Sequence, residues 1–132
     1  MNNFKIMKTV FKVTIKAFIL TLLVLAFNQA SLAQEFDSNS FYRLTTQWLG
    51  GGKSLDVVND GTNNKLQMAD TGSFSGQFWK ITALGGGYYR LTTQWLGDGK
   101  SLDVVNDGTN NRLWMADSGN FTGQFWKIAK IE

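Results

Sequence analysis

Residues 54–64 read SLDVVNDGTNN, and residues 101–111 repeat the same eleven residues letter for letter. The match continues in both directions, because aligning residues 42–81 with residues 89–128 gives forty pairs of which only six differ. The differing pairs are Gly51/Asp98, Lys65/Arg112, Gln67/Trp114, Thr71/Ser118, Ser73/Asn120 and Ser75/Thr122. A match of this length indicates an internal duplication, so the fold is expected to contain two copies of one structural unit.

The first 33 residues differ in composition from the rest of the chain. They carry four Lys and no acid ahead of an eleven-residue run, AFILTLLVLAF, that is apolar except for one Thr. This run is short for a membrane span, which needs about 20 apolar residues, and Ser31 and Ala33 are small enough for signal peptidase. The pattern predicts a signal peptide over residues 1–33 and a secreted or periplasmic protein. The alternative is a retained amphipathic anchor helix.

Removal of this segment changes the charge of the protein. Nine of the thirteen Lys and Arg residues and all ten acids remain, so the net charge falls from +3 to −1. Binding to nucleic acid depends on clustered cations that neutralise phosphates, and the mature chain has only scattered ones. We therefore expect no nucleic-acid partner, and no contact with a membrane once the signal has been removed.

The absence of Cys and His limits the chemistry that the chain can perform. The thiol nucleophile, the commonest general base and the best zinc ligands are all missing. The oxygen-rich stretch DVVNDGTNN does not fit a calcium loop, because an EF-hand register starting at Asp56 puts Val58 at its third position and Gln67 at its twelfth. We expect no catalytic residues, no metal and no cofactor, and hence not an enzyme.

The mature chain is predicted to be all-β, with residues 34–41 as a short linker and residues 42–132 as one domain. Short runs of aliphatic, aromatic and Thr residues end at Gly, Asn or Asp, which is typical of strands and tight turns. The repeats, 42–88 and 89–132, each contain four such runs. The predicted strands are Tyr42–Trp48, Ser54–Val58, Lys65–Ala69 and Gln77–Thr82, followed by Tyr89–Trp95, Ser101–Val105, Arg112–Ala116 and Gln124–Ala129.

Alternation within SLDVV predicts the direction of its acidic side chain. Successive residues of a strand point to opposite faces, so Leu55 and Val57 share one face and Asp56 points to the other. A slip of one residue would bury the carboxylate, which fixes the register. We therefore expect Asp56, and Asp103 in the second repeat, to face outward.

The order of these motifs resembles the repeat of the ricin B-type lectin family. The shared features are LDV, a polar turn, a third strand and a closing Gln-x-Trp, which reads QFW here. The resemblance covers residues 42–132 and implies a β-trefoil, of which this chain supplies two of the usual three four-stranded repeats. It also implies that Trp79 and Trp126 lie in the shared core.

The resemblance further implies where a sugar would bind. In this family the site combines an Asp of the LDV strand, an aromatic ring after the third strand and an Asn before the Gln of Gln-x-Trp. Here Ala69 and Ala116 occupy the ring position, and Gly76 and Gly123 replace the Asn. Phe74 and Phe121 are candidate replacement rings, although each could instead pack its turn onto the core. The expected carbohydrate-binding residues are Asp56, Phe74, Gln77, Asp103, Phe121 and Gln124.

Two other sets of aromatic residues remain open as alternatives. Trp48 and Trp95, each before a glycine turn, could be a second sugar platform or structural caps on their hairpins. Trp114 replaces Gln67 in an otherwise nearly identical repeat, so it could improve the second sugar face or only the packing.

These observations predict a secreted, non-catalytic, carbohydrate-binding module. The alternative is a ricin B-like scaffold that has lost sugar affinity and binds protein. Two repeats would leave apolar faces open where a third is expected, and such faces mark interaction surfaces. We therefore expect a homo-oligomer, with a trimer of six repeats favoured over a dimer of four.

The predicted processing can be tested by mass spectrometry of the exported protein. Cleavage after Ala33 should give a chain that begins at Gln34, because the small residues at the cut fit signal peptidase. Recovery of the intact chain, with Met1, from the membrane fraction would instead support the retained anchor.

Overall fold

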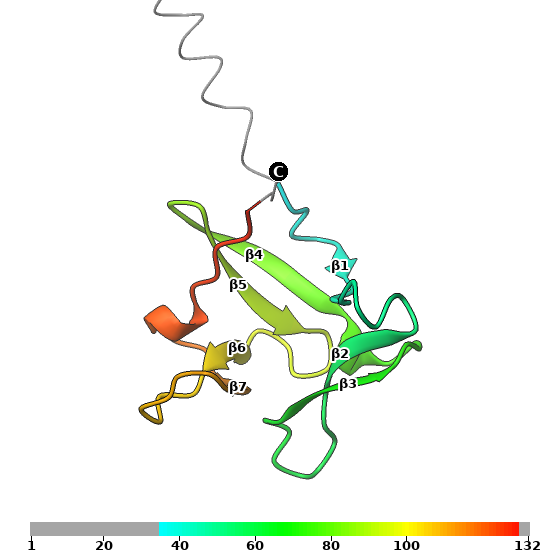
Figure 1. Ribbon diagram of the computed structural model, residues 1–132. Coiled ribbons are helices and arrows are strands. Elements are labelled where there is room, and N and C mark those ends of the chain that lie inside the picture. The colour runs from blue at the N-terminus through cyan, green and yellow to red at the C-terminus, as the bar shows by residue number, and fades with distance from the viewer. Residues whose placement is uncertain (1–34, 130–132) are drawn as a thin grey trace, which may run out of the picture. The chain divides into compact units, whose positions relative to one another are not determined.

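Seven short strands and two single-turn 3₁₀ helices make up the part of the chain that the computed structural model describes, residues 35–129 (Figure 1). No α-helix occurs in this part, which confirms the all-β prediction. The predicted signal peptide lies outside the described residues. The elements are β1 (Phe41–Tyr42), β2 (Lys53–Val57), β3 (Leu66–Asp70), η1 (Ser75–Gln77), β4 (Trp79–Gly85), β5 (Tyr88–Thr93), β6 (Lys100–Val104), β7 (Leu113–Asp117) and η2 (Thr122–Gln124).

Each repeat contains one two-stranded antiparallel hairpin, β2–β3 in the first and β6–β7 in the second. The connecting turns, VNDGTNN in both repeats, need residues that tolerate a positive φ. Gly61 and Gly108 both adopt φ 84°, while Asn63 and Asn110 adopt 56° and 53°. Asn is one of the few residues that enters this region at low cost. The turn chemistry predicted from the sequence is therefore confirmed.

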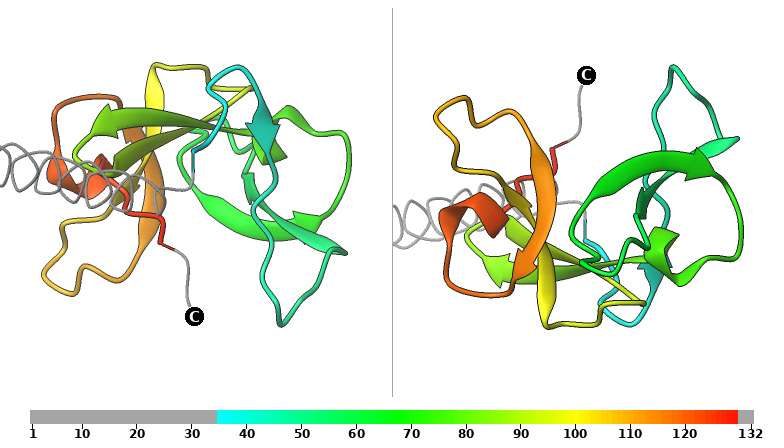
Figure 2. Two further views of the ribbon diagram at one scale, coloured as in Figure 1. Left: turned by 90° about the horizontal axis from the view of Figure 1, so that it is seen from above. Right: turned by 90° about the horizontal axis from the view of Figure 1, so that it is seen from below.

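A three-stranded sheet, in the order β1-β4-β5, joins the two repeats. The last strand of repeat one, β4, pairs with the first strand of repeat two, β5, and the register places Trp79 opposite Thr93. Figure 2 shows the two hairpins as separate lobes, green and orange, that flank this sheet. The repeats are thus connected by main-chain pairing as well as by the chain itself.

Two of the predicted strands are much shorter in the structure. The first strand of repeat one is reduced to the two residues of β1, and Gln124–Ala129 forms only an isolated bridge, between Trp126 and Tyr89. In addition, Gln77 and Gln124 end 3₁₀ turns and do not begin strands. The shortened strands are those whose outer edge has no partner in residues 35–129, and unpaired backbone does not build a ladder.

The core lies between the repeats and is centred on Trp79, which has no exposed surface. Its indole N–H donates to the Leu55 carbonyl oxygen at 3.0 Å. The equivalent indole of Trp126 donates to Leu102 at 2.9 Å but is only partly buried. The predicted core position is therefore confirmed fully for Trp79 and in part for Trp126. The other buried apolar residues are Val57, Ile81, Tyr89, Leu91, Leu102 and Met115.

No helix within residues 35–129 is long enough and apolar enough to cross a membrane.

Replacing Trp79 with Phe should lower the free energy of unfolding by about 2 kcal/mol or more. The Leu55 carbonyl loses a part-buried donor, and the smaller ring leaves a cavity that the core cannot fully close. The same replacement at Trp126 should cost clearly less, because water can replace a partly exposed indole. Urea unfolding of both variants measures the difference, and equal losses would contradict the unequal burial of the two indoles.

Candidate functional site

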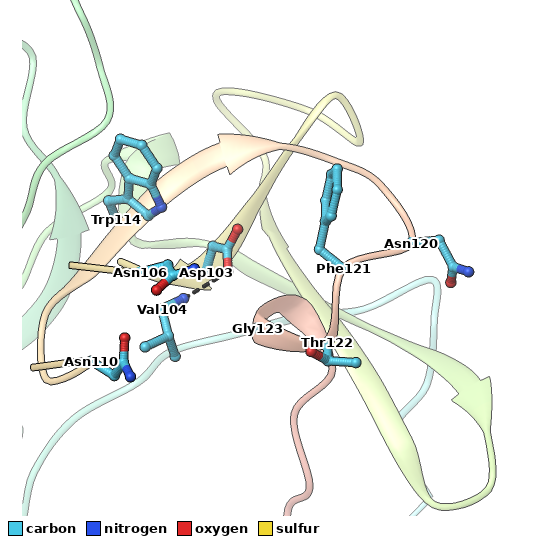
Figure 3. Close-up of a pocket in the computed structure, with 9 residues that line it drawn as sticks. All are labelled: Asp103, Val104, Asn106, Asn110, Trp114, Asn120, Phe121, Thr122 and Gly123. Atoms are coloured by element: carbon cyan, nitrogen blue, oxygen red, sulfur yellow. Dashed lines mark hydrogen bonds between the residues drawn. The ribbon is translucent and has the colours of Figure 1, made fainter. Parts of the chain in front are cut away.

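Each repeat has an open pocket beside the aspartate of its LDV strand. We call the first the repeat-one pocket; it has a volume of about 390 Å³. The second, the repeat-two pocket, has a volume of about 680 Å³ and is drawn in Figure 3. The repeat-one pocket is lined by Asp56, Val57, Asn59, Ser73, Phe74, Ser75, Gly76 and Trp95. The repeat-two pocket is lined by Asp103, Val104, Asn106, Asn110, Trp114, Asn120, Phe121, Thr122 and Gly123.

The two aspartates, which were expected to face outward, lie at the walls of these open pockets and are half-buried. Oδ2 of Asp56 accepts a hydrogen bond from Nε2 of Gln77 at 3.1 Å. Oδ2 of Asp103 accepts the same bond from Gln124 at 3.1 Å, and its Oδ1 accepts from the Val104 backbone at 2.8 Å. Because a carboxylate has about four acceptor positions, both groups retain capacity toward the pocket.

The glutamines of Gln-x-Trp are completely buried, so they cannot contact a ligand directly. Besides its bond to Asp56, Nε2 of Gln77 donates to the Asp70 carbonyl oxygen at 2.9 Å. Oε1 of Gln77 accepts from the Gly72 backbone at 3.1 Å and from Nη1 of Arg43 at 3.0 Å. Both donors and both lone pairs are therefore used. We call this arrangement the glutamine clamp.

Repeat two contains the same clamp apart from the arginine bond, and Arg90 donates instead to the Gly119 carbonyl oxygen at 2.6 Å. Nε2 of Gln124 donates to the Asp117 carbonyl oxygen at 2.9 Å, and its Oε1 accepts from the Gly119 backbone at 3.0 Å. In both repeats the side chain joins the end of a strand, the following turn and the aspartate. The glutamines predicted to bind carbohydrate therefore act in this structure by positioning the aspartates.

The glycine before each glutamine gives the carboxylate its room. A Cβ atom added at Gly76 would overlap Oδ1 of Asp56, and one added at Gly123 would overlap Oδ1 of Asp103. In the sequence, these glycines are notable only because the resemblance leads us to expect an Asn at their positions. In the structure they allow the 3₁₀ turn to pass directly against the aspartate.

The phenylalanines face the pockets and do not pack their turns onto the core. Phe74 is 59% exposed and Phe121 is 60% exposed. Their rings lie over Gly72 and Gly119, where any side chain would collide with them. Figure 3 shows Phe121 and Trp114 on opposite sides of the Asp103 carboxylate.

Trp114 comes from β7 and is 39% exposed. Its ring forms part of the wall of the repeat-two pocket and is not confined to the core. Repeat one has the exposed Gln67 at this position, and its second ring is instead Trp95, which belongs to repeat two. The two pockets thus share one aspartate and one Phe but differ in the second ring.

Three of the six differences between the repeats fall at the pocket walls. Ser73/Asn120 and Ser75/Thr122 line both pockets, and Gln67/Trp114 lines the repeat-two pocket through Trp114. The aspartate, the clamp glutamine and the glycine beside it are unchanged. The differences therefore reach the pocket walls but not the residues that position the aspartate.

A carboxylate in each VNDGTNN turn holds the outer wall in place. Oδ1 of Asp107 accepts hydrogen bonds from the Thr109 hydroxyl at 2.7 Å and from the Asn110 backbone at 3.1 Å. Its Oδ2 pairs with Arg112 at 2.6 Å. These contacts, the Thr109 hydroxyl first, lower the pKa of Asp107 well below its usual range. In repeat one, the Thr62 hydroxyl, the Asn63 backbone and Lys65 lower the pKa of Asp60 in the same way.

Among residues 35–129, no three His, Cys, Asp or Glu side chains come together as a metal site would require.

Comparison with known proteins identifies the fold. Neither a protein-family model nor a curated protein matches the sequence. Among solved structures, the designed threefold-symmetric protein ThreeFoil matches with a TM-score of 0.59 and 25% sequence identity. The match covers 76% of this chain and 70% of ThreeFoil, close to the two thirds that two of three repeats would occupy. ThreeFoil is a β-trefoil with the ricin B-like fold, so the predicted β-trefoil fold is confirmed.

Acid should destabilise the domain partly through the two turn aspartates. Their pKa lies below that of an unfolded Asp, about 3.9, so they stabilise the fold above this pH and the stabilisation is lost as the pH falls. The urea midpoint should therefore decrease between about pH 5 and about pH 3. The double variant Asp60→Asn, Asp107→Asn should show a smaller decrease.

Some acid sensitivity should remain in this variant. Hydrogen bonds from the Asn39 backbone and from Lys53 lower the pKa of Asp37 and Asp70, respectively. A decrease as large as that of the unmodified protein would show that the turn carboxylates do not contribute to the acid response.

Proposed function

We propose that this chain is a non-catalytic carbohydrate-binding protein of the ricin B lectin type, and that it acts outside the cytoplasm after removal of residues 1–33. One observation carries the proposal. The carboxylate of Asp103 lies in an open pocket between two exposed aromatic rings, those of Trp114 and Phe121 (Figure 3).

This combination suits a sugar in two respects. A carboxylate accepts hydrogen bonds from sugar hydroxyl groups, and bonds to a charged acceptor are stronger than those between neutral groups. An aromatic face covers the apolar C–H surface of a pyranose ring. The glutamine clamp adds preorganisation, because Asp103 is held in one position before a ligand arrives and little entropy is lost on binding.

The composition of the pocket supports binding without hydrolysis. Glycosidases use a pair of carboxyl groups that flank the scissile bond. Asp103 is the one acidic residue among those that line the repeat-two pocket. Asp103 and Asp117 both line an adjoining hollow, but the Asp117 carboxylate is paired with Lys100 at 2.7 Å.

A protein-binding scaffold is the second candidate function. It is favoured by the exposure of Phe74, Phe121 and Trp48, because large exposed apolar side chains mark interaction surfaces. A glycan array probed with the mature protein separates the two functions, since the scaffold would bind no glycan.

Replacing Asp103 with Asn should weaken binding of the strongest array glycan by about ten- to a hundredfold, because a charge-assisted hydrogen bond contributes roughly 1.5–3 kcal/mol. The Asn oxygen can still accept from Gln124, so the clamp is kept, but the amide NH₂ takes the place of Oδ1 and the bond from the Val104 N–H is lost. Asp56→Asn should act in the same way on the repeat-one pocket. Isothermal titration of the single and double variants should show stepwise loss.

Asp70→Asn is the matched control. Asp70 is exposed and paired with Lys53 at 2.7 Å, and it is not part of either pocket wall. This variant should bind as the unmodified protein does. Full affinity in a folded Asp56→Asn, Asp103→Asn variant would show that the aspartates are not the sugar ligands.

A further inference from the structure

The same eight residues, YRLTTQWL, occur in two different environments. We call residues 42–49 and 89–96 the opening segments of the two repeats. In repeat two, Leu91 is 5% exposed and Thr93 is 1% exposed. In repeat one, six of the eight residues are exposed, and Trp48 reaches 90%. Because the sequences are identical, the difference must come from what covers them.

The cover in repeat two is the end of repeat one. We call residues 75–81 and 122–128 the closing segments. β4 pairs with β5 along the sheet, and beyond it the Gln94 N–H donates to the Phe78 carbonyl oxygen at 2.8 Å. The Trp95 N–H then donates to the Ser75 carbonyl oxygen at 3.2 Å. We call this contact between a closing and an opening segment the junction.

The closing segment of repeat two has no such cover within residues 35–129. Ile81 is buried at 2% exposure, whereas its equivalent Ile128 is only partly buried and the neighbouring Lys127 is exposed. The chain therefore presents both halves of a second junction, one at each end of the two-repeat unit. The opening segments are identical, and the closing segments differ only by Ser75/Thr122, whose contact is made by a backbone oxygen.

The open junction leaves the repeat-two pocket incomplete. In repeat one, the Trp95 ring lies against Gly76, with a ring carbon 3.5 Å from the place of a Cβ atom, and it lines the pocket. In repeat two, the three atoms nearest to the same place at Gly123 belong to Asp103 and Val104, and none of them to a Trp. The repeat-two pocket is correspondingly larger, at about 680 Å³ compared with about 390 Å³.

We propose that a second copy of this chain places its opening segment on the closing segment of the first, so that Trp48 of the second copy completes the repeat-two pocket. The main-chain bonds would repeat those of the internal junction, from Gln47 to Phe125 and from Trp48 to Thr122. What the completed pocket binds rests on the proposed carbohydrate-binding function, but the association itself does not. The contact is head-to-tail. Because three repeats close a β-trefoil, the second copy supplies only its first repeat to the ring, and its own internal junction opens so that its second repeat lies outside.

One feature of the internal junction is missing from the junction between copies. Lys80 pairs with Asp98 at 3.4 Å across the internal junction. Lys127 is equivalent to Lys80, but Gly51 stands in the place of Asp98. A Cβ atom at Gly51 would have no neighbour within 4 Å, so an Asp fits there. Gly51→Asp should therefore strengthen the association of two copies.

Disulfide trapping tests the contact directly, because the chain has no Cys of its own. Trp48→Cys and Thr122→Cys variants of the mature chain are mixed under mild oxidation without any sugar. Because Trp48→Cys also removes the interface ring, the mixture is kept above the dissociation constant measured for Trp48→Ala. The mixed disulfide should then form several times faster than either homodimer. A chain carrying both Ser75→Cys and Trp95→Cys is the positive control and should crosslink internally. If the mixed and the homodimeric disulfides form at equal rates, the proposal is wrong.

Sedimentation velocity over a range of concentrations gives the strength and stoichiometry of the association. Trp48→Ala should raise the dissociation constant about tenfold or more, as removal of a central interface aromatic does. Gly51→Asp should lower it by up to about fivefold, and Gly51→Asn, which adds no charge, should leave it unchanged. An unmodified chain that stays monomeric, because other residues of the same chain cover the closing segment, would overturn the proposal.

The glycan array separates this proposal from the proposed function. If the array is positive, titration should show that Trp48→Ala weakens the repeat-two pocket and leaves the repeat-one pocket unchanged. If the array is negative, the carbohydrate proposal fails, whereas a rapid mixed disulfide still establishes the junction. Equal weakening of both pockets by Trp48→Ala would contradict the assignment of Trp48 to one of them.

Discussion

In each repeat, one buried side-chain amide hydrogen-bonds to the backbone segments and to the aspartate that form the pocket. The side chain of Gln77 bonds to the end of β3, to the turn after it and to the carboxylate of Asp56. Burying an amide is favourable only when its donors and acceptors are paired, so each partner has to be in place for the others to be stable. The position of the aspartate is thus a consequence of the same bonds that close the repeat.

Burial in this protein is a property of position as much as of sequence. Trp48 and Trp95 have the same neighbours in the sequence, yet only the second is covered, because a closing segment precedes it in the sheet. A β-trefoil repeat buries its opening strand against the repeat before it and its closing strand against the repeat after it. Two repeats therefore contain one complete junction and two half-junctions, which explains both the shortened strands and the exposure of Trp48.

The sequence predicts the parts of the fold that local chemistry decides. The hairpin strands were expected at Ser54–Val58 and Lys65–Ala69 and lie within one residue of these bounds, because Gly and Asn fix the turn between them. The terminal strands were overestimated, since their length depends on a partner outside the repeat. At the site, alternation identified Asp56 but not its hydrogen bond to Gln77, which is 21 residues away and invisible to a local pattern.

The positions at which the two repeats differ can be explained by what each residue does: clamp residues support the fold, whereas pocket-wall residues do not. A change in the glutamine clamp would leave a buried donor or acceptor unpaired, which costs stability as well as the position of the aspartate. A change at the pocket wall, such as Gln67/Trp114, alters only what the ligand meets. After duplication of such a repeat, each copy keeps its aspartate in the same position, while the residues of its pocket wall can change. Under the proposed carbohydrate-binding function, two pockets in one domain provide two attachment points for a multivalent glycan, and the second contact then benefits from a high effective concentration.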